Sequence, residues 1–406
     1  MTETADRINI SLWLLFVVTF FSNAFGGAIS TLMSVYLPEV VNELVESNQL
    51  EQLGDISAYI NALYLLGWTL GGFLWGLISD RIGRLLSFHI SFALLGASTL
   101  VISFVSSWEM VVLFRLLSGF CTGGILVITN TYLSEVWPVK TRSIFIGFLS
   151  IGFPVGIVTA GMINFLFHDW RTGFGIGLFP LVIAFFSIMV IKEIKREDEI
   201  VNKNTLLLSL RTTFNDNHQN LIKGSIIFGS MLIGLWAIFS WLPTWVQSLL
   251  IDSDGQQERS LCMMLLGLGG LTGGFFSGWI SGSIGLRKTM LICFTGCLVT
   301  SLILFGTNHS FSDIIYLETA VLAIFFGISQ GSLATYIPQL FPSFIRGTST
   351  GFCYNTGRVF TTAAVFFVGM LVTFFGGYSE TLLAFSGIFL IGLITIYFSS
   401  DLKIKT

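Results

Sequence analysis

Two long apolar runs are joined by the segment Gly76-Leu77-Ile78-Ser79-Asp80-Arg81-Ile82-Gly83-Arg84, which is the most informative part of the chain for its fold. Its small residues allow two helices to approach closely and the backbone to reverse direction between them. Four of its positions occur again 202 residues later, as Gly278, Ser281, Ile284 and Gly285. A motif that returns at a long, constant offset indicates a chain built from two similar halves.

A second set of residues supports the same repeat. Five residues downstream of the first motif recur 204 positions later; they are Tyr132, Pro138, Arg142, Gly147 and Phe148, which return as Tyr336, Pro342, Arg346, Gly351 and Phe352. The small difference between the two offsets is what variation in loop length produces. Parallel repeats of this kind are typical of transporters that bind their substrate at the midplane of the membrane.

The composition points to a membrane protein. Of the 406 residues, 53% are hydrophobic and 11% are charged, whereas a soluble domain carries about 25% charged residues. This excludes a cytosolic enzyme, a nucleic-acid-binding protein and a disulfide scaffold. A membrane-spanning helix needs about 20 mainly apolar residues, and the chain contains twelve such runs: 11–37, 56–78, 88–106, 109–134, 143–167, 172–191, 222–250, 260–281, 289–306, 313–340, 347–375 and 379–399.

The predicted fold is an all-α membrane protein with twelve transmembrane helices in two parallel six-helix repeats. Long continuous apolar runs favour helices over a barrel, whose short strands alternate in polarity. We expect an N-terminal six-helix bundle at 1–191, a cytoplasmic linker at 192–221 and a C-terminal six-helix bundle at 222–406.

The orientation follows from the Lys and Arg residues. With both termini in the cytoplasm, sixteen of the 20 lie in cytoplasmic segments and two on the opposite side, which is the bias that the positive-inside rule requires. We therefore expect a multi-pass protein of the cell membrane, the cytoplasmic membrane if the source is bacterial.

The chain resembles the major facilitator superfamily along its whole length. Gly76–Arg84 matches the family signature G-x-L-a-D-R-x-G-R between spans two and three, although Leu85 stands where a second basic residue usually follows. A pattern on span four resembles sugar porters, aromatic-acid:proton symporters and synaptic-vesicle-protein-like transporters; it consists of Arg115, Gly119, Gly123, Gly124, Tyr132, Glu135, Pro138, Lys140 and Arg142. Gly357-Arg358 on span eleven is similar to the last two groups. The resemblance implies two six-helix bundles that rock around a central site.

The resemblance also implies a gate on the cytoplasmic side. Asp80 would meet the N-terminus of span eleven near Gly347, where the helix dipole favours an anion. The other charged residues of this ion-pair latch are Arg81, Arg84, Glu135 and Arg142, and the remaining gating residues are Gly76, Gly83 and Arg346. The latch is predicted to be asymmetric, because uncharged residues replace three of its members in the second half: Gly282, Ser283 and Gln339. The alternative is that these charges only set the topology.

Arg115 and Arg358 are the basic residues that fall inside spans. A charge near the bilayer centre costs at least about 2.5–3.5 kcal/mol and normally faces a cavity or a partner. Arg358 follows Gly347 by eleven residues, which places it roughly 16 Å along the helix, near the midplane. A guanidinium presents a planar fork of donors that matches a carboxylate or phosphate. Both residues are therefore predicted substrate contacts, with a structural ion pair or carbonyl contacts as the alternative.

Further polar and aromatic residues are predicted to line the cavity: Asn23, Asn130, Trp241, Gln247, Gln330, Tyr336, Tyr354 and Asn355. In the aromatic-acid symporters that the chain resembles, span one carries an Asp, and here Asn23 stands in its place and cannot titrate. Glu318 is the carboxylate that lies well inside a span, so it is the candidate proton carrier. A fixed hydrogen-bond partner is the alternative role for Glu318.

The function predicted from these observations is secondary active transport of a small organic anion, an aromatic or sugar-derived carboxylate, by proton-coupled symport with alternating access. The expected partners are the small-molecule substrate, a proton and the lipid bilayer, with a monomeric chain and no nucleic acid, cofactor or metal. An enzyme is not expected, because the four His are scattered and no phosphate-binding loop occurs. The alternatives are a facilitator of a neutral sugar or polyol, a receptor that does not transport, and a channel.

Overall fold

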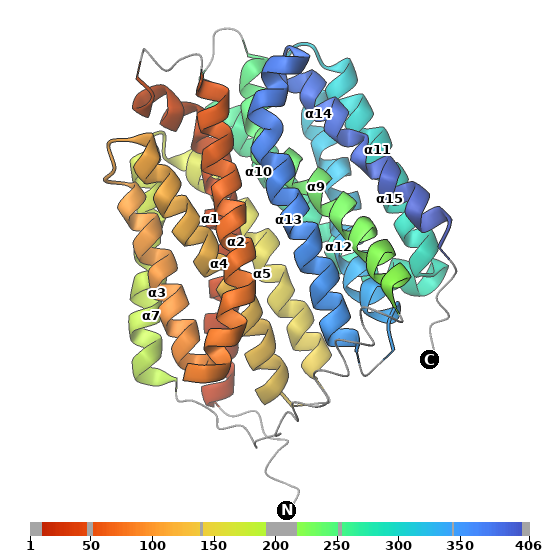
Figure 1. Ribbon diagram of the computed structural model, residues 1–406. Helices are drawn as coiled ribbons and strands as arrows, with labels where there is room; N and C mark the ends of the chain where they lie inside the picture. Colours follow the sequence, from red (N-terminus) through yellow and green to blue (C-terminus); the bar gives the residue numbers. More distant parts are fainter. Residues whose placement is uncertain are drawn as a thin grey trace, which may run out of the picture. The chain divides into compact units, whose positions relative to one another are not determined.

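A computed structural model describes residues 10–46, 52–138, 141–191, 217–250, 254–342 and 345–399. These residues contain helices and no strand (Figure 1). The helices of the first half are α1 (Ile10–Leu44), α2 (Leu53–Ile82), α3 (Arg84–Ile102), α4 (Trp108–Val136), α5 (Arg142–Leu166), α6 (Trp170–Phe174), the 3₁₀ turn η2 (Gly175–Gly177) and α7 (Leu178–Val190). Those of the second half are α9 (His218–Ser248), α10 (Gln256–Ile284), α11 (Leu286–Thr307), α12 (Ile314–Gln339), α13 (Arg346–Phe375), α14 (Tyr378–Ser386) and α15 (Ile388–Tyr397).

Twelve helical segments of the described residues are long and apolar enough to cross a membrane, which confirms the predicted all-α fold. Two of them are interrupted, which the sequence analysis did not foresee: η2 separates α6 from α7, and Gly387 separates α14 from α15. α3 begins four residues before the predicted span, because Gly83 adopts φ 99° and reverses the chain within one residue. Glycine is favoured there because it has no Cβ to clash in this left-handed conformation.

The chain divides into two compact units, Met1–Glu197 with Gln256–Met264, and Asp198–Gly255 with Leu265–Thr406. Most of the predicted linker at 192–221 lies outside the described residues, and its last residues belong to α9.

In the first unit, α2 and α4 pack with their backbones in direct contact. A Cβ added at any of four glycines would overlap a carbonyl oxygen of the facing helix; these are Gly67 and Gly71 of α2 and Gly119 and Gly123 of α4. Small residues have this role in membrane helices because lipid supplies no hydrophobic force between spans, so association depends on close packing.

The second unit repeats this packing between α10 and α12. A Cβ at Gly273 would overlap the carbonyl oxygen of Ile324, and a Cβ at Gly327 would overlap that of Gly270. Gly273 follows Gly71 by 202 residues and Gly327 follows Gly123 by 204, which are the two offsets of the sequence repeat. The two halves therefore use equivalent glycines for equivalent helix pairs.

α6 begins at an acidic cap in the short connection after α5. The Asp169 side chain accepts hydrogen bonds from the backbone N–H groups of Arg171 at 3.2 Å and Thr172 at 3.0 Å, and from the Thr172 hydroxyl at 2.7 Å. Burial alone would raise the pKa of the Asp169 carboxyl, but these hydrogen bonds and the positive charge of Arg171 outweigh it and hold the pKa below its usual value.

Candidate functional site

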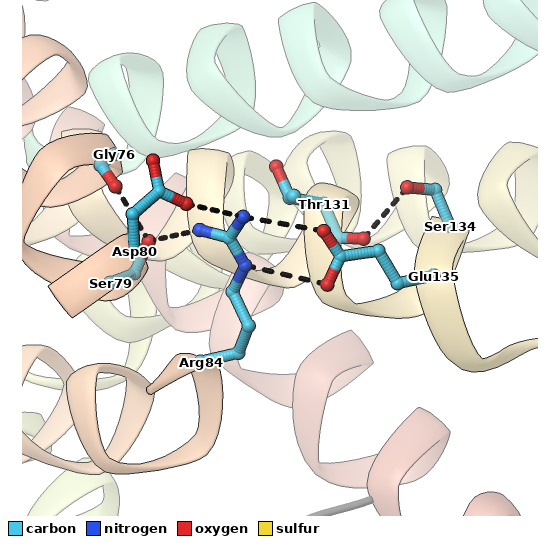
Figure 2. Close-up of polar contacts among 7 residues, drawn as sticks. All are labelled: Gly76, Ser79, Asp80, Arg84, Thr131, Ser134 and Glu135. Carbon is cyan, nitrogen blue, oxygen red and sulfur yellow. Dashed lines mark hydrogen bonds and ion pairs between the residues drawn. The ribbon is translucent and has the colours of Figure 1, made fainter. Parts of the chain in front are cut away.

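The signature motif forms an ion-pair cluster where α2 turns into α3 (Figure 2). Arg84, the first residue of α3, is its centre: Nη2 lies 2.6 Å from Asp80 Oδ1, and Nη2 and Nε lie 3.3 and 3.4 Å from the two carboxylate oxygens of Glu135. Arg84 also donates to the Ser79 hydroxyl. Since Glu135 lies in the last turn of α4, one guanidinium joins the ends of the two helices that the glycines hold together.

Three of the residues predicted for the latch thus meet, and the others lie apart. Arg142 donates from Nε and Nη2 to the carbonyl oxygen of Trp137, at 3.1 and 3.0 Å, and so closes the turn between α4 and α5. Arg81 and Arg346 are exposed. The side-chain environment of Gly347 lies outside the described residues, and the approach of Asp80 to the start of α13 stays a prediction.

Arg115 is buried in the first unit, with 1% of its surface exposed. Its Nη1 and Nη2 donate to the carbonyl oxygens of Ile29 and Ser30 on α1, at 2.9 and 3.4 Å. Its guanidinium carbon lies 3.8 Å from the centre of the Tyr64 ring. Among the described residues it forms no ion pair with a carboxylate. Carbonyl contacts are the alternative that the sequence left open for this residue.

Tyr64 completes this buried cluster, and sequence reasoning did not select it. Its hydroxyl lies 2.6 Å from the Ser30 hydroxyl and donates to the Thr122 hydroxyl at 3.0 Å. The spacing of Tyr64, Gly67 and Gly71 places all three on one face of α2. That spacing was the available signal that Tyr64 faces span four.

Arg358 lies in the second unit, on α13, and differs from Arg115 in its surroundings. It is half-buried, and the structure gives it one hydrogen bond, from Nη1 to Asn355 Oδ1 at 3.3 Å. One turn before it, the ring of Tyr354 stacks on Phe228 of α9 with centroids 4.3 Å apart and planes at 23°. No carboxylate of the described residues forms an ion pair with Arg358.

The close packing of α13 against α9 shows which part of α9 lies beside Arg358. A Cβ at Gly357 would lie 2.7 Å from Phe228 Cδ1 and 3.1 Å from the Cα of Gly229, so α9 and α13 nearly touch beside Arg358. Trp241 lies twelve residues beyond Gly229, which is about 18 Å farther along α9. Trp241 is fully buried, and its indole nitrogen has no hydrogen-bond partner among the residues that the structure describes. The structure therefore does not bring Trp241 to Arg358.

α12 brings another predicted residue to the level of Arg358. Asn220 Nδ2 donates to the carbonyl oxygen of Leu340 at 3.0 Å, and Phe239 and Phe326 are in ring contact, so α9 and α12 run antiparallel. Gly229 lies between Asn220 and Phe239 on α9, and Gln330 lies between Phe326 and Leu340 on α12. By this correspondence, Gln330 lies within about one helical turn of the height of Gly229 along the helix axes. Its Nε2 is buried and has no hydrogen-bond partner in the described part of the chain. Tyr336 lies farther along α12 and is fully buried.

The remaining predicted residues are Asn23, Asn130 and Gln247. Asn23 Nδ2 donates to the Thr129 hydroxyl at 3.0 Å, and Asn130 Nδ2 donates to the Leu126 carbonyl oxygen at 2.7 Å. Gln247 is half-buried in the last turn of α9. For all three, substrate contact stays a prediction.

Glu318, the predicted proton carrier, is half-buried on α12. Its Oε2 accepts a hydrogen bond of 2.7 Å from Asn308 Nδ2, at the end of α11. Among the described residues, no group of three or more His, Cys, Asp or Glu is arranged to hold a metal ion.

Comparison with known proteins agrees with this architecture. The family model of the Major Facilitator Superfamily matches residues 12–361. A cis,cis-muconate transport protein of Acinetobacter baylyi is 25% identical over 386 residues, which are 91% of this chain and 90% of that protein. A sialic acid transporter of Escherichia coli K12 is 28% identical over 338 residues, 80% of this chain and 79% of that protein.

A solved structure has the same fold. The crystal structure of a D-xylose–proton symporter superposes with a TM-score of 0.81, at 14% identity, over 97% of this chain and 99% of that one. The match of the family model to most of the chain, together with twelve spans and the Arg84-centred cluster, identifies the protein as a multi-pass membrane transporter, not an enzyme, that belongs to the Major Facilitator Superfamily.

Proposed function

We propose that this transporter carries a small organic anion and that Arg358 binds the carboxylate of the anion. The observation that carries the proposal is the Arg358 side chain, which is half-buried within a span, has one hydrogen bond to its own helix and lacks an ion pair to the described residues. A charge at such a position is costly unless a cavity or a partner compensates for it. A carboxylate matches the planar fork of donors that a guanidinium presents.

The neighbours of Arg358 support a planar or ring-containing anion. The stacked rings of Tyr354 and Phe228 offer an apolar surface one turn from the guanidinium, and aromatic surfaces favour contact with flat apolar groups. Gln330 adds a buried amide donor without a partner at about the same level. Muconate and sialic acid, the substrates named for two relatives, both carry carboxylates, which supports the same class.

In this proposal, Arg358 and Arg115 do not contribute equally to anion binding. Arg115 has the smaller role, because its Nη1 and Nη2 donate to α1 and its Nε is buried. Transport by alternating access, a monomeric chain, the cell membrane as location and cytoplasmic termini also belong to the proposal. The uneven distribution of Lys and Arg supports the orientation.

Proton-coupled symport with Glu318 as the proton carrier is the proposed transport mode. A facilitator of a neutral sugar or polyol is the second candidate. The hydrogen bond between Glu318 and Asn308 favours the facilitator, since a carboxylate fixed by an amide need not change its protonation during transport. Uptake that ceases when the proton gradient is collapsed supports symport, and undiminished uptake supports the facilitator.

The test of the anion site is a binding titration of the purified transporter with cis,cis-muconate and benzoate, and with benzamide as a neutral analogue. We expect the carboxylates to bind and the neutral analogue to bind much more weakly. In Arg358→Lys the dissociation constant should rise at least about tenfold, or about 1.4 kcal/mol, because a point charge loses the bidentate geometry.

The matched control is Arg287→Lys, which makes the same change at another half-buried arginine of the second unit, on α11. It should leave the dissociation constant unchanged. Equal affinity of Arg358→Lys and the unaltered protein for the carboxylates refutes the assignment of Arg358. Equal affinity for benzoate and benzamide refutes the anion as substrate class.

A further inference from the structure

A groove in the first unit, distinct from Arg115 and Arg358, has the features of a binding site for an apolar chain. It has a volume of about 380 Å³ and lies between α5, the α6–η2–α7 segment and Phe25 of α1. Ile163, Phe167 and Phe179 form much of its apolar wall. We call it the α5–α7 groove.

The polar groups in the groove are already engaged. Two threonines belong to the lining, and the hydroxyl of Thr159 donates to the Val155 carbonyl oxygen at 2.9 Å, while that of Thr172 donates to Asp169 Oδ2 at 2.7 Å. The wall therefore offers little to a charged or polar ligand, which would lose its hydrogen bonds with water on entry. The chemistry of the lining selects an apolar occupant.

Glycines in the α6–η2–α7 segment form one side of the groove. Gly173 and Gly177 are packing positions, because a Cβ there would collide with Tyr36 and with Leu100. Gly175 is different: a Cβ there would meet no atom within 4 Å. Gly175 thus leaves open space on the groove, and that space is not required for packing inside the unit.

The membrane-spanning segments beside the groove indicate what kind of molecule occupies it. The helical segments Ile144–Leu166 and Trp170–Val190, which flank the groove, are both membrane-spanning, and Phe167 and Phe179 of its wall are 45% and 60% exposed. The lining includes Thr159 and Ile163 of α5 and Phe167 directly after its end, a stretch of about 12 Å at the rise of an α-helix. The groove therefore follows the direction of the spans, which is also the direction of lipid chains. An empty apolar groove would forfeit dispersion contacts along its whole wall.

We propose that the α5–α7 groove holds an acyl chain of a phospholipid from the surrounding bilayer, bound tightly enough to stay with the protein after extraction. Lipid gains no hydrophobic free energy by moving from the bilayer into the groove. Retention must come from close packing against the wall. A side chain that fills the groove at Gly175 should therefore expel the lipid. The proposal does not depend on the identity of the transported substrate.

The experiment compares Gly175→Leu with Gly147→Leu after identical detergent washing. Gly147 is a suitable control because it lies on α5, has no atom within 4 Å of an added Cβ and is not part of the groove. Native mass spectrometry should detect bound phospholipid on the unaltered protein and on Gly147→Leu. Gly175→Leu should retain several-fold less, with the same elution volume and helical content. Equal retention in both variants, or bound detergent without phospholipid, overturns the proposal.

A second measurement needs no variant and so does not depend on the folding of Gly175→Leu. A phospholipid with a photoactivatable group on its acyl chain is incorporated with the unaltered protein into liposomes and irradiated. Adducts should be enriched several-fold on the peptides that contain Thr159, Phe167 and Phe179, compared with peptides of other exposed spans. Uniform labelling of all spans overturns the proposal.

Discussion

Replacing Gly71 with alanine should weaken the first unit by forcing α2 away from α4. The added Cβ would overlap the carbonyl oxygen of Phe120 and lie 2.7 Å from its carbonyl carbon, whereas ordinary contact begins at 3.4 Å. The helices must separate by more than about 0.7 Å, because the carbonyl oxygen lies even closer to the added Cβ than the carbonyl carbon does. Because the obstacle is backbone inside a helix, no rotamer change can relieve it.

The expected cost is about 1–3 kcal/mol, the usual range for overpacking. For a chain of this size that lowers the apparent melting temperature by about 2–6 °C, extrapolating from smaller domains. The same displacement acts on the Arg84-centred ion pairs, because Asp80 lies on α2 and Glu135 lies on α4. The Arg84-centred cluster should therefore loosen along with the helix pair.

The assay is thermal unfolding in detergent, with Gly147→Ala as the control. Gly147 has open space around an added Cβ, so alanine should be neutral or stabilise by up to about 1 kcal/mol through its higher helix propensity. Equal melting temperatures of Gly71→Ala and Gly147→Ala would refute the argument that these glycines set the distance between the helices.

Three further predictions concern the polar groups of the first unit. Glu135→Gln should lower stability by about 1 kcal/mol, since Arg84 loses a partly buried charged acceptor; a double-mutant cycle with Arg84→Met that gives no coupling would contradict this. The lowered pKa of Asp169 means that its contribution to stability is complete above its ordinary pKa of about 3.9 and is lost as the pH falls through the folded-state value. The melting temperature of Asp169→Ala should therefore fall less steeply on acidification than that of the unaltered protein, and parallel curves would exclude the effect. Tyr64→Phe should lower the free energy of unfolding by about 1 kcal/mol, because the hydroxyl hydrogen bonds are lost. Tyr64→Leu should lower it by about 2 kcal/mol more, because the ring contact with Arg115 is lost as well. Equal melting temperatures for the two variants would argue against the cation–π contact.

Some features of the site could be predicted from the sequence, and others could not. Distance along a helix follows from residue number at 1.5 Å per residue, so the midspan position of Arg358 was predictable. Its near neighbours Tyr354 and Asn355 share its helix and were predicted with it. Phe228 and Tyr64 were missed, because each meets its partner across a helix interface that residue number does not specify.

The twelve spans, the two-fold repeat and the family could be inferred from residue order. Lipid requires long apolar helices with satisfied backbones, and close helix contacts require glycine at fixed spacings. The tertiary structure alone decided what each buried charge touches. Arg84 meets Asp80 and Glu135, Arg115 meets the carbonyl oxygens of α1, and Arg358 keeps a single hydrogen bond. These partners depend on how each helix is rotated about its axis and on which helix faces it, and the packing of residues far apart in the sequence sets both.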